Sequence, residues 1–172
     1  NMFACSGILF NHESPLRGDQ FVTKKITMGL SKIKLGLQDY LELGNLDSKR
    51  DWGYAEDYVE AMFLMLQYKK PGDYVISTGQ TYSVRDFINI ACNKLNIDIE
   101  WEGKGINEIA INKKNGKKII KINPKFYRPT EVDLLLGNSD KAKRILKWKP
   151  KTDFESLVDK MIEYDYSIFK NK

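Results

Sequence analysis

The sequence has few of the residues on which several kinds of site depend. One histidine and two cysteines among 172 residues exclude a metal site built from several such side chains. There is no run of about 18 apolar residues, so we expect no membrane-spanning helix and no membrane partner. There is no GxGxxG motif, and Gly103-Lys104-Gly105 lacks the following Ser or Thr of a phosphate-binding loop.

The two cysteines indicate a compartment. Cys5 and Cys92 lie far apart, each in an apolar run, which predicts buried, reduced thiols and a cytoplasmic location. The first residues, Asn1 to Cys5, lack the basic segment and cleavage site of a signal peptide. Because a strand-like apolar run begins almost at once, we expect a piece of a longer protein.

The charge balance narrows the class of ligand. The net charge is +5, and much of the excess comes from lysines at 113–125 and 141–151. These lysines are interspersed mainly with Ile, Asn and other non-aromatic residues, and Trp148 is the one aromatic residue in the two stretches, so we expect no nucleic-acid partner. A small polyanion explains the same surplus.

Helical and strand-like segments alternate along the chain, which predicts the α/β class. Two capping boxes are expected at helix starts, Ser83 with Asp86 and Thr152 with Glu155. We expect a mobile excursion at 103–118. Expected strands are 3–10, 40–44, 74–77, 99–101 and 118–122, and expected helices are 21–35, 55–69, 83–95, 140–147 and one from 152.

Apolar spacing in two of these helices predicts which side chains face the core. In 21–35 the stripe is Val22, Ile26, Leu30 and Ile33. In 55–69 the predicted core residues are Tyr58, Val59, Met62, Phe63 and Leu66.

Arg128-Pro129-Thr130-Glu131 pairs a permanent cation with an acid three residues later. A guanidinium binds a phosphate through two parallel hydrogen bonds, and a carboxylate accepts hydrogen bonds from ribose hydroxyls. Pro129 biases Arg128 toward extended backbone. The segment suits a nucleotide diphosphate or a nucleotide-sugar, and a surface ion pair beside a turn is the alternative.

Further polar candidates each have two interpretations. Asn11, His12 and Arg17 follow the first strand, where they could bind phosphates or a dinucleotide, or could bond their own loop backbone. Lys25 could reach a base carbonyl or lie in solvent. Arg50 could bind a phosphate or stack on Trp52.

Several long motifs follow one another along the chain. They are Gly7 to Pro15, Phe21 to Lys25, Leu43 to Gly53, Asp57 to Met62, Arg128 to Asp133, and Trp148-Lys149-Pro150. In this order they resemble the GDP-mannose 4,6-dehydratase family over essentially the whole chain.

The resemblance implies the C-terminal part of an extended short-chain dehydrogenase/reductase: the last strands of a Rossmann-type sheet plus the small α/β substrate-binding domain. Residues 1–172 would form a single incomplete unit. Within it, 1–12 and about 50–80 would be late elements of the NADP-binding domain. About 13–49 and 81–172 would mostly bind the GDP-sugar.

The family's members are lyases. They convert GDP-mannose to GDP-4-keto-6-deoxymannose and water with tightly bound NADP, on the way to GDP-fucose, and they act as dimers or tetramers. The resemblance implies that His12 and Arg17 contact NADP. It implies the following substrate contacts: Asn11, Arg50 and Arg128 to the diphosphate, Val22 and Lys25 to the guanine, and Glu131 to the ribose.

Two departures accompany the resemblance. Leu16 stands where the family loop usually has another arginine. The glycine-rich loop and the catalytic Thr, Glu and Tyr-x-x-x-Lys are expected upstream of Asn1. We therefore expect no catalytic residue in this chain, no dehydration by it alone, and NADP binding only with the full-length enzyme.

Alternatives are a non-catalytic GDP-sugar-binding module, or another nucleotide-sugar dehydratase, epimerase or reductase of the same scaffold. Strands 3–10 and 74–77 would have open edges without the rest of their sheet, which predicts self-association.

Overall fold

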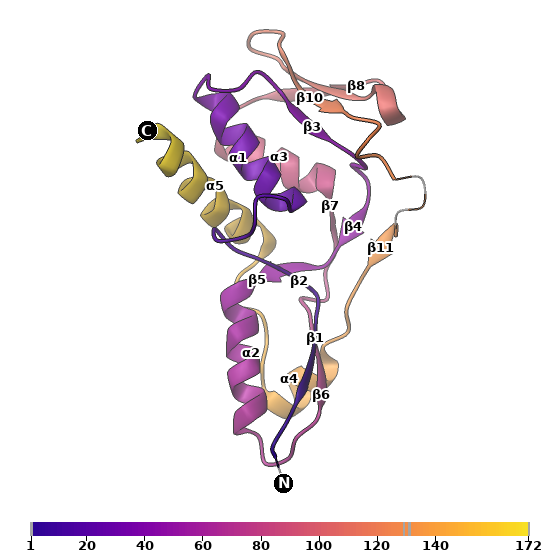
Figure 1. The fold of residues 1–172 in the computed structure, drawn as a ribbon, viewed down its shortest axis with the longest axis vertical. Coiled ribbons are helices and arrows are strands. Elements are labelled where there is room, and N and C mark those ends of the chain that lie inside the picture. Colours follow the sequence, from indigo (N-terminus) through magenta and orange to yellow (C-terminus); the bar gives the residue numbers. More distant parts are fainter. Residues whose placement is uncertain (1, 129, 131, 172) are drawn as a thin grey trace. The chain divides into compact units, whose positions relative to one another are not determined.

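The computed structural model describes residues 2–128, 130 and 132–171, which form two compact units (Figure 1). The predicted α/β class is confirmed. β7 (Tyr82–Ser83) and α5 (Phe154–Lys170) each cross from one unit to the other along the chain. Unit 1 comprises Asn1–Ser14, Lys49–Tyr82 and Leu134–Leu157, and unit 2 comprises Pro15–Ser48, Ser83–Asp133 and Val158–Lys172.

Unit 1 is built on two parallel strands, β1 (Ser6–Leu9) and β6 (Asp73–Ile76). Both predicted strands are confirmed: β1 is shorter than 3–10, and β6 starts and ends one residue before 74–77. α2 (Ala55–Gln67) and α4 (Asp140–Leu146) pack on this pair. Their shared core is Tyr58, Ala61, Met65, Tyr74, Ile76, Ala142, Leu146 and Trp148.

Two shorter parallel pairs complete the strands of unit 1. β2 (Asn11–Glu13) pairs with β5 (Trp52–Tyr54), and β4 (Lys49–Arg50) pairs with β11 (Leu134–Leu135). The predicted polar loop after the first strand is therefore wrong in part. The polar residues Asn11 to Glu13 suggested a loop. In the structure they form an extended strand that pairs with β5, which is distant in sequence.

The predicted core stripe of the second helix is also largely wrong. Tyr58 is fully buried, but Val59, Met62, Phe63 and Leu66 are exposed. The buried face of α2 instead runs through Asp57, Tyr58, Ala61 and Met65. α2 is apolar on more than one face, so spacing alone could not select the face that packs on β1 and α4.

Unit 2 contains a four-stranded sheet, two whole helices and most of α5 (Figure 1). The two whole helices are α1 (Val22–Lys34) and α3 (Val84–Lys94). The strand order is β3 (Leu41–Leu43), β10 (Lys118–Ile122), β9 (Ile109–Asn112) and β8 (Ile99–Glu102), with a 3₁₀ turn η1 (Gly105–Asn107).

The expected excursion at 103–118 is wrong, because β9 lies inside it and pairs antiparallel with both β8 and β10. The Gly, Asn and Lys residues that suggested a loop occupy the turns at either end of β9. Ala110 of β9 is fully buried, so a single small side chain supplies the core contact that the sequence pattern did not reveal.

Of the two predicted capping boxes, one is confirmed and one is wrong. Ser83 and Asp86 form the predicted capping box at the start of α3. The predicted box at the last helix is wrong, because α5 begins at Phe154 and the Asp153 carboxylate accepts from the Ser156 N–H at 2.8 Å. Hydrogen bonding to Ser156 lowers the pKa of Asp153. Asp153, not Thr152, therefore caps this helix.

Candidate functional site

In unit 2 the polar candidates follow the carboxyl ends of two parallel strands. β3 and β10 pair in parallel and end together at Leu43 and Ile122. The turn after β10 is bonded back to β3, because Asn123 N donates to the Leu43 carbonyl at 2.9 Å. The loops 44–47 and 123–128 therefore leave the same edge, the position where parallel sheets bind ligands.

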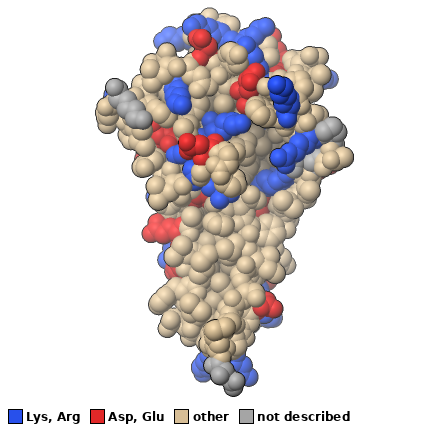
Figure 2. Space-filling model, in the orientation of Figure 1, with Lys and Arg blue, Asp and Glu red and all other residues tan. Residues whose placement is uncertain are grey.

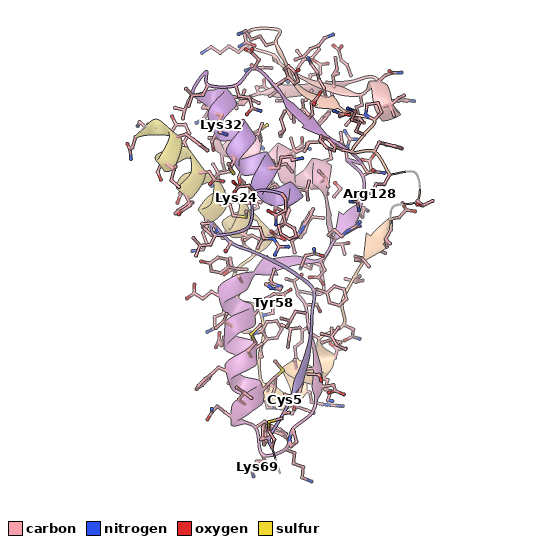
Figure 3. The ribbon with its side chains drawn as sticks, viewed as in Figure 1. Cys5, Lys24, Lys32, Tyr58, Lys69 and Arg128 are labelled. Carbon is pink, nitrogen blue, oxygen red and sulfur yellow. The ribbon has the colours of Figure 1, made fainter. Side chains whose placement is uncertain are left out.

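Asn45 holds the backbone of Arg128 in place. Its side-chain oxygen accepts from Arg128 N at 2.8 Å, and its side-chain amide donates to the Arg128 carbonyl at 3.0 Å. A Cβ at Gly44 would lie 2.1 Å from the Phe126 carbonyl oxygen, so only glycine permits this close approach. Both main-chain groups of Arg128 are bound while its side chain lies at the exposed surface (Figure 3).

Lys25 reaches the same loop from α1. Its ammonium lies over the Phe126 ring, 4.2 Å from the centroid, which is a cation–π contact. Lys25 is half-buried, and Val22 lies at the exposed start of the same helix. Lys25 therefore contacts Phe126, which lies two residues before Arg128 on the same loop. Glu131 lies outside the described residues.

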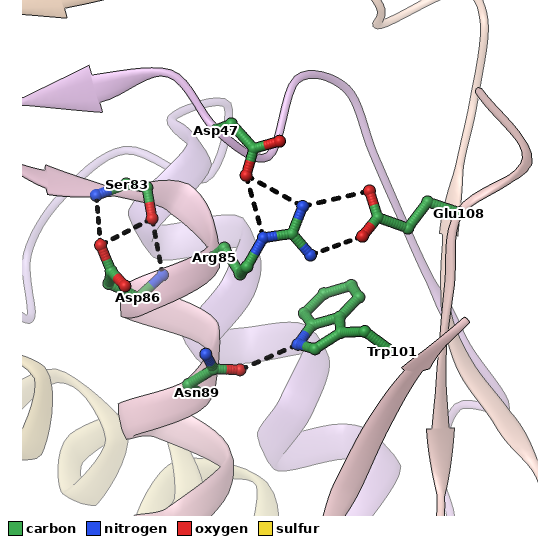
Figure 4. A network of polar contacts seen from close by, with 7 residues as sticks. All are labelled: Asp47, Ser83, Arg85, Asp86, Asn89, Trp101 and Glu108. Atoms are coloured by element: carbon green, nitrogen blue, oxygen red, sulfur yellow. Dashed lines mark hydrogen bonds and ion pairs between the residues drawn. The ribbon is translucent and has the colours of Figure 1, made fainter. Parts of the chain in front are cut away.

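Arg85 fixes the loop that contains Asn45 (Figure 4). Its guanidinium pairs with Asp47 at 2.9 Å and with Glu108 at 2.6 Å, and its backbone N–H donates to the Leu46 carbonyl. Hydrogen bonding to Glu108 raises the pKa of Arg85, which stays cationic. The guanidinium also lies over the Trp101 ring, which limits its movement. The turn at 45–47 is therefore anchored to both α3 and the β8–β9 connection.

In unit 1, Asn11 and His12 follow the carboxyl end of β1 and lie half-buried in β2. The His12 Nδ1 lies 2.9 Å from the Phe10 carbonyl oxygen. Because a carbonyl only accepts, Nδ1 carries the proton, and in the neutral ring Nε2 is then the acceptor. The imidazole stacks on Tyr58 at 5.1 Å, which fixes the ring plane.

Asp51 organises the neighbouring loops of unit 1. This fully buried carboxylate accepts from Thr78 N, Thr78 Oγ1, Gly79 N and Gly137 N, at 2.7 to 3.2 Å. Burial raises the pKa of Tyr58, and the negative charge of Asp51 raises it further, so its phenol stays neutral. Arg50 is the last residue of β4, directly before Asp51. The Arg50 Nη1 donates to the Lys49 carbonyl at 2.8 Å.

The remaining predicted site residue, Arg17, belongs to unit 2. Its guanidinium stacks on the Phe21 ring at 3.5 Å. Leu16 beside it is exposed. Arg50 and His12 belong to unit 1 and Arg128 and Arg17 to unit 2, so the convergence of these residues on one ligand stays a prediction.

A buried ion pair was not anticipated from the sequence. Lys24 on α1 bonds Asp165 on α5, and Thr27 donates to the second Asp165 oxygen at 2.6 Å. Lys24 also donates to the Pro15 carbonyl at 2.8 Å. The predicted stripe on α1 is confirmed at Ile26 and Leu30, which are fully buried, whereas Val22 is exposed and Ile33 is half-buried. Thr23, Lys24, Thr27 and Ser31 are buried there beside Ile26 and Leu30.

Within the described residues, no helix combines the length and apolar character needed to cross a bilayer. No cluster of three or more His, Cys, Asp or Glu side chains suited to a metal ion occurs in that part of the chain either.

Comparison with known proteins gives close relatives of a single kind. The family model described as GDP-mannose 4,6 dehydratase matches residues 1–161. The GDP-mannose 4,6 dehydratase of Drosophila melanogaster is 54% identical over 170 residues, 99% of this chain and 43% of that protein. The human protein of the same name is 51% identical over 170 residues, 99% of this chain and 46% of that protein. The chain spans less than half the length of these relatives.

Solved structures share the fold at low identity. RMD from Pseudomonas aeruginosa complexed with NADPH has a TM-score of 0.77 at 20% identity, over 94% of this chain and 48% of that one. A dTDP-glucose 4,6-dehydratase from Bacillus anthracis in complex with NAD has a TM-score of 0.70 at 17% identity, over 96% of this chain and 45% of that one. The predicted fold, part of an extended short-chain dehydrogenase/reductase, is confirmed.

Proposed function

The chain belongs to the GDP-mannose 4,6-dehydratase family, and we propose that it is the C-terminal, substrate-binding portion of such an enzyme. The whole enzyme would be a lyase that converts GDP-mannose to GDP-4-keto-6-deoxymannose and water. It would act as a dimer or tetramer in the cytoplasm, where the two free thiols would stay reduced.

One observation supports the substrate site above all others: the Asn45 amide binds both main-chain groups of Arg128 beside the Lys25–Phe126 contact. In the proposal, Arg128 binds the diphosphate and Lys25 with Val22 contacts the guanine. The Phe126 ring holds the Lys25 ammonium, so less side-chain entropy is lost when a base carbonyl binds it. Arg50 and Asn11 would complete the diphosphate site, and Glu131 would bind the ribose.

His12 and Arg17 are the proposed contacts to NADP. A ring nitrogen left to accept and a guanidinium held against Phe21 suit a ribose hydroxyl and a phosphate, respectively. When bound, NADP would supply the hydride acceptor. The residues of this chain would bind and orient the GDP-sugar, and would exclude water by filling the rim of the site with side chains such as Phe126.

Calorimetry of GDP binding to the purified chain tests the substrate site. We expect Arg128→Ala to weaken binding by about 1.5–3 kcal/mol, because a hydrogen-bonded cation is removed from a phosphate. Lys125→Ala is the matched control, since Lys125 is an exposed cation on the same loop. Equal losses for the two variants, or no GDP binding by the wild type, would contradict the assignment.

A binding module without catalytic function is the second candidate, because the site described here needs no catalytic residue. It would bind GDP in the same way. It would differ in gaining no dehydratase activity when the remaining part of a family member is supplied.

A further inference from the structure

The guanidinium of Arg85 is already paired with two carboxylates of unit 2 (Figure 4). Nη1 and Nη2 donate to the two oxygens of Glu108 at 2.6 and 3.1 Å, and Nε donates to Asp47 at 2.9 Å. The guanidinium carbon lies over the Trp101 ring, 4.7 Å from its centroid, and the Trp101 indole N–H donates to Asn89 at 3.0 Å. The charge of Arg85 is therefore balanced inside the protein and is not directed at a ligand.

The two carboxylates differ in how firmly they hold Arg85. The side chain of Glu108 is 13% exposed, and that of Asp47 is 78% exposed. Water weakens an exposed ion pair, whereas a shielded bidentate pair of arginine and carboxylate is strong and has a fixed geometry. Glu108 therefore fixes the guanidinium, and the guanidinium in turn restrains Asp47.

The start of α3 also binds the backbone of the loop that contains Asp47. The Arg85 N–H donates to the Leu46 carbonyl at 2.9 Å, and the Val84 N–H donates to the Ser48 carbonyl at 3.3 Å. Three consecutive residues of this loop, 46–48, are thus bonded to the first turn of α3. The loop cannot shift without breaking several of these bonds.

Asn45, the next residue toward the N-terminus, passes this position on to Arg128. The turn before Arg128 is closed on itself, because the Phe126 and Tyr127 N–H groups donate to the Asn123 carbonyl at 2.9 and 3.2 Å. Asn45 binds the N–H and the carbonyl of Arg128 at 2.8 and 3.0 Å. The direction in which the Arg128 side chain leaves the backbone is therefore tied to the loop that Arg85 holds.

Direction matters here because the surface charge of unit 2 is mixed. Figure 2 shows Lys and Arg side chains among Asp and Glu side chains on the visible face of unit 2. Neighbouring charges of opposite sign cancel much of each other's field, so binding of a diphosphate depends on how single cations are presented. A guanidinium binds a phosphate through two parallel hydrogen bonds, and a small rotation of its loop would lose one of them.

We propose that Arg85 is a positioning residue for the diphosphate site. Together with Glu108 it fixes the loop 45–48, and through Asn45 that loop aims Arg128 at the diphosphate. The inference rests on the proposed function, which assigns Arg128 to this ligand group. Part of the affinity for GDP is then set by two side chains that do not touch GDP.

One substitution separates positioning from a direct effect of charge. Glu108→Gln removes a negative charge and keeps the size of the side chain. If only charge mattered, GDP would bind more tightly, because an anion would be repelled by one carboxylate fewer. Positioning has the opposite sign: glutamine accepts at one oxygen only, so the guanidinium loses one of its two bonds and GDP binds more weakly.

Calorimetry of GDP binding to the purified chain tests the proposal. We expect Glu108→Gln and Arg85→Lys each to weaken binding about fivefold, since lysine keeps the charge but not the planar donor fork. In an Arg128→Ala background the same two changes should alter the affinity less than about twofold, because the side chain that they aim is gone. Lys113→Gln is the matched control at the exposed ion pair with Asp98, and it should leave GDP binding unchanged.

A second measurement needs no ligand. Hydrogen exchange followed by NMR reports on the Arg128 N–H, which Asn45 holds. Arg85→Lys and Glu108→Gln should speed its exchange at least about fivefold and leave the N–H of Ile120, in the buried strand β10, unchanged. Equal acceleration at both sites would show a general loss of stability and would overturn the proposal.

Two further outcomes would overturn it: tighter GDP binding by Glu108→Gln, or losses that are as large in the Arg128→Ala background as in the wild type. GDP binding that depends on Arg128, with Arg128 exchange unchanged in the variants, would refute the role of Arg85 and leave the proposed function standing. No GDP binding by the wild type, with the expected change in exchange, would refute the diphosphate assignment and leave the control of Arg128 by Arg85 in place.

Discussion

At the scale of single residues, Cys92 and Cys5 differ in environment. Cys92 is fully buried on α3, and burial raises the pKa of its thiol to about 12. Cys5 is half-buried, with its sulfur 3.5 Å from the Met65 carbonyl. At pH 8 we expect iodoacetamide to modify Cys5 in the folded chain and to leave Cys92 unmodified, because the thiolate is the reactive form. Mass mapping with and without urea measures this; equal modification of both thiols in the folded chain would contradict it.

The buried thiol of Cys92 makes the free energy of unfolding depend on pH in the alkaline range. Folding favours the neutral form of Cys92, whose unperturbed pKa is 9.0. The contribution is fully present below pH 9 and is lost as pH rises from 9 toward 12. Urea denaturation between pH 8 and 11 should show a smaller loss for Cys92→Ala than for wild type. Burial also raises the pKa of Tyr58, but Tyr58 is present in both chains and cancels in the comparison.

The sequence predicted which cations belong to the candidate site, and that assignment stays a prediction; it did not reveal the residues that hold their loop in place. Arg128 and Lys25 stood out because charge and motif are local properties. Asn45 and Phe126 did not, because their role depends on the end of β3 lying beside the end of β10. A glycine followed by asparagine directly after a strand, as in Gly44-Asn45, was the one local signal available.

At the scale of elements, the buried Lys24–Asp165 pair joins α1 to α5. We expect Asp165→Asn to cost about 3–5 kcal/mol of stability, because it leaves a buried ammonium without its counter-charge. Asp98→Asn is the control at an exposed pair with Lys113, where less than about 1 kcal/mol is expected. Denaturant midpoints measure both. Comparable losses of stability in the two variants would mean that the buried pair stabilises the fold no more than the exposed pair does. Lys24→Met with Asp165→Leu should recover most of the loss.

Element types were more predictable than element faces. The helices at 55–69 and 83–95 and the strand at 118–122 followed from spacing and caps that act within a few residues. The packed face of α2 did not, since it is set by β1 and α4. β9 was missed because its pairing with β8 and β10 comes from tertiary structure.

At the scale of the whole molecule, we expect the purified chain to show no turnover of GDP-mannose with added NADP. The described residues bind and orient, and the proposal assigns them no proton transfer at the sugar. Product analysis by chromatography at high enzyme concentration measures this. Activity would contradict the proposal. Restoration by a co-expressed segment of a relative, comprising the part that this chain does not match, is the positive control.

The Asn45 contact with Arg128 assigns the anchoring of the loop and the recognition of the ligand to different side chains. Both hydrogen bonds from Asn45 go to main-chain atoms of Arg128, so another residue with a backbone N–H at position 128 would project from the same anchored position. The side chain at position 128 can therefore be replaced without changing the backbone of the loop. A chain with lysine at 128 should keep the loop's shape but offer a single point charge in place of a planar two-pronged donor, which makes position 128 a natural place to change ligand preference.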